Sequence, residues 1–153
     1  MLRLKASGPE WGISRYPRIL RIFRIDIDIA RAIYPFIFLP DDLYGRIVSK
    51  GESDSDAWAV IVHERAHLTR MHEILPLIGP LVFGFKYMRA DKEFMLAEEL
   101  HAIGEEMKYR KRVGILYDIK RKARQFSSRL YQNLVSYERA EALLTELWER
   151  TPV

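Results

Sequence analysis

Runs of alternating apolar and polar residues lie in the N-terminal third of the chain and predict β-strands. In RIFRIDIDIARAI, residues 21–33, isoleucines recur at every second position, which is the period of a half-buried strand. AIYPFIFLP, residues 32–40, is a second β-rich run, in which Pro35 favours an edge position because proline cannot donate a ladder hydrogen bond. RIV, residues 46–48, predicts a short third strand, and several prolines and glycines predict an irregular lead-in over residues 1–17.

Helical spacing replaces this alternation in the rest of the chain. Ser55 or Asp56 is expected to cap the first helix. Asp91 and Ser136 are the expected caps of the third and fifth helices, and Gly114 is a good stop for the third. The expected helices cover residues of about 56–70, 80–88, 92–113, 116–134 and 137–150. Strands followed by helices predict an α+β fold with a small N-terminal mixed sheet packed on helices.

Composition and charge narrow the class of protein. The chain has 153 residues, of which 48% are hydrophobic and 30% charged, which is typical of one globular domain, here expected over residues 1–153. A net charge of +4 makes the chain mildly basic, which is weaker than the concentrated positive charge expected of a nucleic-acid-binding domain. There is no cysteine, which excludes disulfides and thiolate metal sites. No stretch has the continuous apolar core of a signal peptide or a membrane span, so we expect no membrane partner and, by default, a cytoplasmic location.

Chemistry is concentrated in HERAH, residues 63–67. On a helix, residues four positions apart lie on one face, so His63 and His67 present two imidazoles to one point. Imidazole is a good ligand for zinc, with a bond of about 2.0–2.1 Å. Glu64 lies beside the first histidine, where it can take a proton from a water on the metal. The spacing H-E-x-x-H therefore predicts two zinc ligands and a general base.

A catalytic zinc site needs a third protein ligand and an open position for water. The segment FMLAEELHAIGEE supplies two adjacent acids, Glu98 and Glu99, whose side chains point about 100° apart on a helix. Only one of the two can face the metal. We choose Glu99, because the small Ala102 three residues later lets this helix approach the HERAH helix, and we keep Glu98 as the alternative.

Together, HERAH and the later ELHA resemble the gluzincin zinc metallopeptidases, and most closely their minimal single-domain members. The resemblance spans residues 56–103 and implies a zincin-like fold, Zn²⁺ as cofactor and a peptide or protein substrate. It implies that His63 and His67 bind zinc, that Glu99 is the third ligand and that Glu64 is the catalytic base. It also implies that an edge strand, expected near residues 33–39, binds substrate in extended form.

The resemblance has one departure and leaves several residues without a role. Many relatives carry an aspartate that orients a zinc histidine where this chain has Ile103, which cannot do so. Tyr44 and Tyr87 are candidates for stabilising an oxyanion, and the sequence does not choose between them. His72 and His101 are the remaining histidines; His101 is expected at the surface or behind the ligands.

Two other functional classes stay open at this stage. Ile103 permits a zinc-bearing structural or interaction module without turnover. The basic segments at 108–112 and 120–124 permit a nucleic-acid-associated protein with structural zinc, although solvated helix ends explain these charges better. The apolar segment at 74–87 is expected to form core beneath the zinc site rather than a membrane contact.

Overall fold

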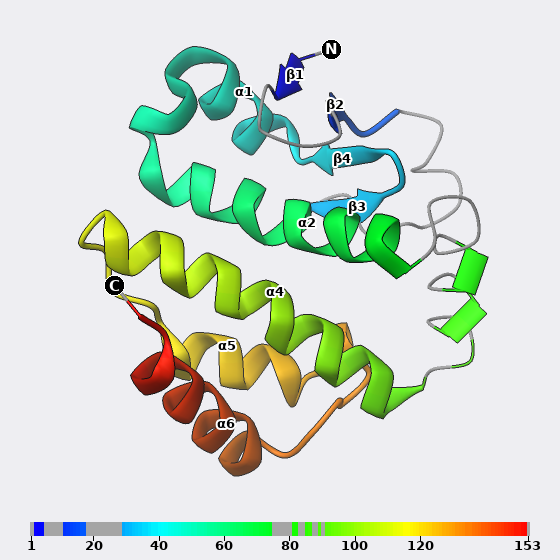
Figure 1. Ribbon diagram of the computed structural model, residues 1–153, viewed down its shortest axis with the longest axis vertical. Helices are drawn as coiled ribbons and strands as arrows, with labels where there is room; N and C mark the ends of the chain where they lie inside the picture. Colours follow the sequence, from blue (N-terminus) through cyan, green and yellow to red (C-terminus); the bar gives the residue numbers. More distant parts are fainter. Residues whose placement is uncertain are drawn as a thin grey trace. The chain divides into compact units, whose positions relative to one another are not determined.

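The computed structural model describes residues 2–4, 11–17, 29–74, 81–82, 85–86, 89 and 91–152. The chain divides into two compact units, Met1–Pro80 and Leu81–Val153. An N-terminal mixed sheet precedes most of the helices, so the prediction of an α+β fold is confirmed (Figure 1). That the whole chain folds as one domain stays a prediction.

The first unit is built on a four-stranded sheet with the order β1-β2-β4-β3. Its strands are β1 (Leu2–Leu4), β2 (Trp11–Arg15), β3 (Arg31–Ile33) and β4 (Phe36–Leu39). β1 and β3 pair antiparallel with β2 and β4, respectively, whereas β2 and β4 run parallel, with Ile13 opposite Ile37. The irregular lead-in predicted for residues 1–17 is therefore wrong, because β1 and β2 lie within it.

The predicted strand positions need two further corrections. Of the run 21–33, residues up to 28 lie outside the described part of the chain, and only β3 at its end is seen as a strand. The run 32–40 does not form one edge strand, because the chain turns at Tyr34 and Pro35 between β3 and β4. β4 has a neighbour on each side, so among the described residues the edge on that side of the sheet is β3.

A helix that the sequence pattern missed follows the sheet. α1 (Asp41–Lys50) contains the RIV segment, so the third strand predicted at 46–48 is wrong. Asp41 and Asp42 lie in its first turn and Lys50 in its last, where these charges interact favourably with the helix dipole. Ile47 is the one buried residue of α1. A short 3₁₀ turn, η2 (Gly51–Ser53), connects α1 to the next helix.

α2 (Ser55–Ile74) carries the HERAH motif. Its cap is Asp54, one residue before the predicted candidates: the carboxylate Oδ1 of Asp54 accepts a hydrogen bond from the backbone N–H of Ala57, at 3.2 Å. Arg46 of α1 donates two hydrogen bonds to the same carboxylate, at 2.8 and 2.6 Å. These hydrogen bonds connect the first turn of α2 to α1.

The core of the first unit lies between the sheet and α2. Ile13, Ile37 and Leu39 of the sheet are fully buried, and they cluster with residues of one face of α2, including Ile61 and Leu68. α2 lies beside β3 and β4 in Figure 1, and both strands contact it. This packing fixes the direction in which the remaining faces of α2 point.

The second unit is helical. α4 (Lys92–Arg112) begins at Asp91, whose side chain accepts a hydrogen bond from the backbone N–H of Phe94, as predicted. Gly114, two residues after its last residue Arg112, has a φ of +74°. The backbone N–H groups of Gly114 and Ile115 donate to the carbonyls of Lys111 and Arg110, at 3.1 and 2.8 Å. This is the Schellman arrangement, and it confirms the predicted stop.

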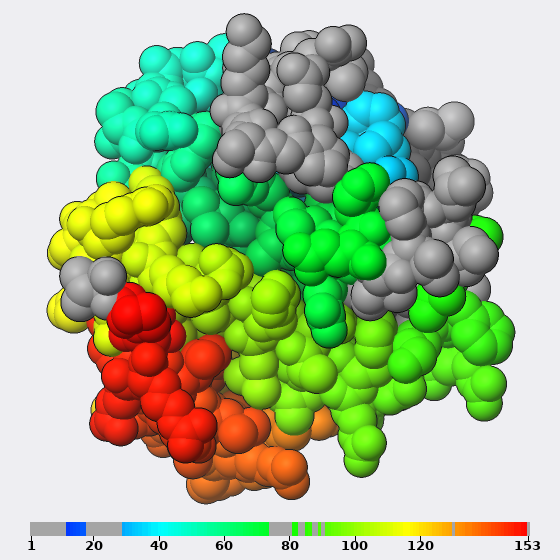
Figure 2. All heavy atoms as spheres, in the orientation of Figure 1, coloured from blue at the N-terminus to red at the C-terminus, as the bar shows by residue number. Residues whose placement is uncertain are grey.

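Two shorter helices complete the second unit. α5 (Ile119–Phe126) is followed by the 3₁₀ turn η3 (Arg129–Tyr131), so the single helix predicted for 116–134 is too long. α6 (Tyr137–Arg150) begins at the predicted cap Ser136, whose hydroxyl accepts from the backbone N–H of Arg139. α6 packs on α4 and α5, and Figure 2 shows its end, in red, against the end of α4, in yellow.

Little of the apolar segment at 74–87 can be compared with its prediction, because residues 75–80, 83–84 and 87–88 lie outside the described part of the chain. Residues 81–82 and 85–86 are helical, within the helix predicted at 80–88. Leu81 and Phe85 are 73% and 54% exposed, so the prediction that the segment is core is wrong for these two side chains.

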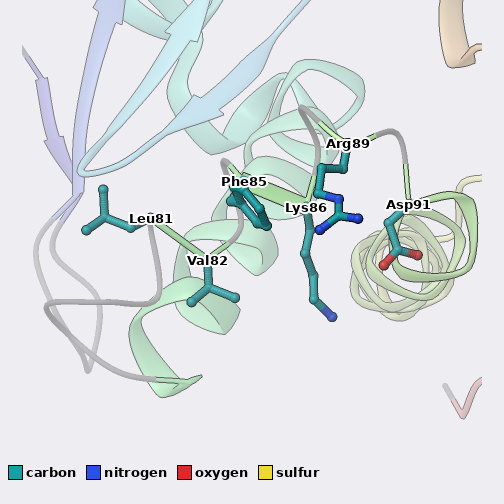
Figure 3. A pocket seen from close by; sticks show the side chains of 6 residues that line it. All are labelled: Leu81, Val82, Phe85, Lys86, Arg89 and Asp91. Atoms are coloured by element: carbon teal, nitrogen blue, oxygen red, sulfur yellow. The ribbon is translucent and has the colours of Figure 1, made fainter.

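These residues border a surface hollow of about 670 Å³. The hollow is lined by Leu81, Val82, Phe85, Lys86, Arg89 and Asp91. Figure 3 shows its apolar side chains toward one end and its charged side chains toward the other. None of the predicted zinc ligands lines it.

Candidate metal centre

The motif on α2 is buried. Between residues 57 and 70 of this helix, only Arg65 and Arg70 are exposed. His63, Glu64 and His67 retain 6%, 8% and 7% of their accessible surface, although each carries a polar group that burial penalises. A surface helix with chance histidines would leave these side chains in water, so their burial indicates a site.

The two histidines lie one above the other, as their spacing predicts. Their ring centroids are 5.0 Å apart and the rings are nearly perpendicular, at 77°. Ile61 and Leu68, on a different face of α2, pack into the core of the first unit. This packing orients the helix, so the imidazoles of His63 and His67 are presented together on a fixed face.

The adjacent acids of α4 are both buried, at 5% exposure for Glu98 and 8% for Glu99. This excludes the solvated acidic face that a segment so rich in glutamate suggests. Glu99 belongs to a row of residues spaced by four along α4, in which its neighbours Met95 and Ile103 are core residues of the second unit. A carboxylate in an apolar row requires an electrostatic partner, because an uncompensated buried charge is strongly destabilising.

His63, His67 and Glu99 lie close enough together to hold a metal ion. One ligand atom from each, a ring nitrogen or a carboxylate oxygen, lies within 4.8 Å of the others, and all three residues are buried. Among the described residues, this is the group of histidine and acidic side chains with that geometry. The sequence named the same three residues, and their roles as ligands stay a prediction.

The donor set fits zinc by its chemistry. Two imidazole nitrogens and one carboxylate oxygen form the three-ligand set of many catalytic zinc sites, in which the fourth position is left to water. Hard cations such as Mg²⁺ and Ca²⁺ prefer sites made of oxygen alone, so the two histidines argue against them. The geometry and the donors are therefore those of a site for a metal ion that binds imidazole.

A lysine that the sequence pattern assigned to a solvated helix end contacts Glu99. The ammonium Nζ of Lys122, on α5, lies 3.7 Å from Oε2 of Glu99, and the two side chains are 14% and 10% exposed. The same ammonium donates a hydrogen bond to the hydroxyl of Tyr131, at 2.9 Å. Burial disfavours the charged form of Lys122, but attraction to Tyr131 and Glu99 outweighs burial and raises its pKa. Lys122 therefore stays charged at neutral pH.

The other residues that the sequence analysis considered for the site are Ile103, two tyrosines and two histidines. Ile103 is fully buried in the core of the second unit. Tyr44 packs against the core of the first unit with Arg15 over its ring, as a packing residue would. Tyr87 lies outside the described residues. His101 is exposed, as expected, and His72 is half-buried.

Four cations of the basic segments are engaged inside the second unit, whereas Lys120, Arg121 and Arg124 are exposed. Arg110 donates to the carboxylate of Glu106 at 2.8 Å, and Lys111 donates to the backbone carbonyl of Thr151 at 2.7 Å. Lys108 pairs with Glu105, and Lys122 with Glu99. The carboxylates of Glu99, Glu105 and Glu106 therefore offset part of the positive charge of these segments.

Among the described residues, no helix is both long and apolar enough to cross a membrane. Comparisons with protein-family models, with curated proteins and with solved structures find no match to this chain. The case for a metal centre therefore rests on the three buried donors and their geometry.

Proposed function

We propose that this protein is a zinc-dependent metallopeptidase of the gluzincin type. The observation that carries the proposal is the clustering of buried His63, His67 and Glu99 within 4.8 Å, with Glu64 buried next to the first ligand. Two imidazoles, a carboxylate and an adjacent carboxylate that binds no metal are the parts of a hydrolytic zinc site. The resemblance of HERAH and ELHA to gluzincins supports the same reading.

In this proposal the chain's residues have distinct tasks. His63, His67 and Glu99 would hold the ion, which when bound supplies a Lewis acid that polarises the scissile carbonyl and makes water more acidic. The carboxylate of Glu64 accepts the proton of the attacking water and then delivers it to the nitrogen of the departing amine. Burial of Glu64 favours this role, because it keeps bulk water from solvating the carboxylate.

The sheet edge offers a way to bind a peptide. Among the described strands, β3 is at the edge and contacts α2, which carries Glu64 (Figure 1). A peptide that pairs with β3 in extended form would run beside the helix that carries the proton acceptor. The expectation of edge-strand recognition is therefore retained for Arg31–Ile33, and not for β4.

The test compares the purified wild type and its variants for zinc content and for cleavage of an unstructured peptide library. Wild type should contain about one zinc per chain and cleave peptides. Glu64→Gln keeps the shape of the side chain but cannot accept a proton, so it should bind zinc normally and cleave about 10²–10⁴-fold more slowly. Glu73→Gln, an exposed glutamate on the same helix, is the matched control and should behave as wild type.

Two outcomes would contradict the proposal. Cleavage by Glu64→Gln at the wild-type rate would remove the assigned base. A wild-type protein that holds zinc and cleaves nothing in the library would instead favour a structural or interaction module. Loss of both zinc and cleavage in His63→Ala would link any observed activity to the metal.

A further inference from the structure

The contact between Lys122 and Glu99 has a consequence for the proposed metal site. Lys122 is held from several sides: its ammonium donates to the Tyr131 hydroxyl at 2.9 Å and lies 4.9 and 5.5 Å from the ring centroids of Tyr131 and Phe126. Two aromatic rings and a hydrogen bond fix a side chain that is otherwise among the most flexible. The ammonium therefore has a defined position, 3.7 Å from Oε2 of Glu99.

A carboxylate ligand can bind a metal ion through one oxygen or through both. An ammonium beside one of the oxygens attracts its negative charge and competes with the ion for it. We propose that Lys122 is a positioning residue that occupies one oxygen of Glu99 and so limits Glu99 to a single oxygen for the metal. This inference rests on the proposed metal site. It assigns to Lys122 the task of keeping one coordination position open for water and substrate.

The same contact affects the metal-free protein. Glu99 lies in an apolar row of α4, where a lone carboxylate would be costly. Lys122 compensates this charge when no metal is present, and a bound ion compensates it otherwise. Removing the ammonium therefore destabilises the metal-free protein more than the metal-bound protein, so the variant should bind metal more tightly.

The experiment uses Co²⁺ as a spectroscopic probe in the full chain. Four-coordinate Co²⁺ absorbs visible light strongly and five-coordinate Co²⁺ weakly, so the absorption reports how many atoms bind the ion. Lys122→Met keeps the length of the side chain and remains compatible with the rings of Phe126 and Tyr131. Lys120→Met, an exposed lysine on the same helix, removes the same charge and is the matched control.

Wild type and Lys120→Met should share a strong absorption and one dissociation constant. Lys122→Met should bind Co²⁺ at least about tenfold more tightly, because Glu99 loses the ammonium that competes with the ion, and with weaker absorption. Lys122→Arg keeps the cation and should return both readouts toward wild type. Tyr131→Phe removes the hydroxyl that holds the ammonium, so it should shift both in the direction of Lys122→Met, and it serves if that variant does not fold.

The outcomes separate this inference from the proposed activity. Weaker or unchanged Co²⁺ binding with an unchanged spectrum in Lys122→Met and Tyr131→Phe would overturn the role of Lys122. Wild type that binds Co²⁺ but cleaves no peptide would overturn the peptidase proposal and leave the role of Lys122 to be decided by the spectra. Wild type that binds no Co²⁺ would overturn both.

Discussion

Replacing Ile103 by aspartate tests whether the departure from the gluzincin pattern can be repaired. The pattern places an aspartate here to orient a zinc histidine, so a reading from sequence alone expects Ile103→Asp to improve the metal site. The structure predicts the opposite. Ile103 has no exposed surface and belongs to the core cluster of the second unit, with Met107, Phe126 and Leu144 among its members.

The size of the effect follows from this burial. Loss of most of a buried isoleucine side chain costs about 2–5 kcal/mol, and an unpaired buried carboxylate adds a penalty of several kcal/mol unless it becomes protonated. We expect Ile103→Asp to lower the free energy of unfolding by about 4 kcal/mol or more, out of a total of about 5–15 kcal/mol for a typical domain. Ile103→Val, which removes one methylene, should cost about 0.5–1.5 kcal/mol.

Urea unfolding, followed by circular dichroism, measures the free energy of unfolding of each variant. The same measurement with and without zinc shows how tightly each variant binds the metal. The valine variant is the control for the position itself. If Ile103→Asp unfolded at the wild-type urea concentration and held zinc more tightly, Ile103 would face the ligands rather than the core, and the reasoning from burial would be refuted.

Three further predictions concern the ligand, the cap and the helix stop. Glu99→Ala should weaken zinc binding by about 10–100-fold or more in an indicator titration, whereas Glu98→Ala should change it little; the reverse order would move the ligand to Glu98. The hydrogen bond from Arg46 is the main reason that the pKa of Asp54 falls to about 2 from 3.8. A lowered pKa stabilises the fold above the unfolded value, so the stability advantage of wild type over Asp54→Asn should be full above about pH 4 and disappear as pH falls toward about 2 in acid-unfolding curves. Gly114→Ala meets no neighbouring atom but forces alanine to a φ of +74°, so it should destabilise by about 1–2 kcal/mol in thermal unfolding; an unchanged Tm would contradict the strain.

The sequence located the helices well where their ends carry chemical signals. Asp91, Ser136 and Gly114 each have a local hydrogen-bonding role that depends on near neighbours in the chain, and all three predictions are confirmed. The cap of α2 was placed one residue late because Ser55, Asp56 and Asp54 are all good capping residues. Choosing among them requires the backbone geometry.

The sheet was predicted less well, because strands of three to five residues are too short to show a period. Glycine and proline near β2 suggested irregular chain, and strand pairing depends on contacts between distant segments. The sequence pattern does not predict α1, although Asp41, Asp42 and Lys50 are signals of a helix start and end, because the short apolar RIV segment fits a strand as well as a helix.

The clustering of His63 and His67 could be predicted because H-E-x-x-H imposes its own geometry on any helix, and Glu99 followed from the small Ala102 and from the resemblance to gluzincins. The burial of Glu98 and the contact of Lys122 with Glu99 could not be predicted, because both depend on which helices pack together. A lysine within KRKAR looks like a solvated charge until α5 has a neighbour. The charge of a segment is therefore a weak guide to the environment of each residue in it.

The pairing of Glu99 with Lys122 also constrains how this protein can change over evolutionary time. Loss of either residue alone removes a charged partner from the other buried side chain, which is more costly than loss of both, since apolar side chains can replace a buried ion pair with little penalty. The two positions should therefore vary together: glutamate with a cation in chains that keep the proposed metal site, and two apolar residues in chains that have lost it. An apolar residue at both positions would mark a descendant that retains the fold and has lost the chemistry.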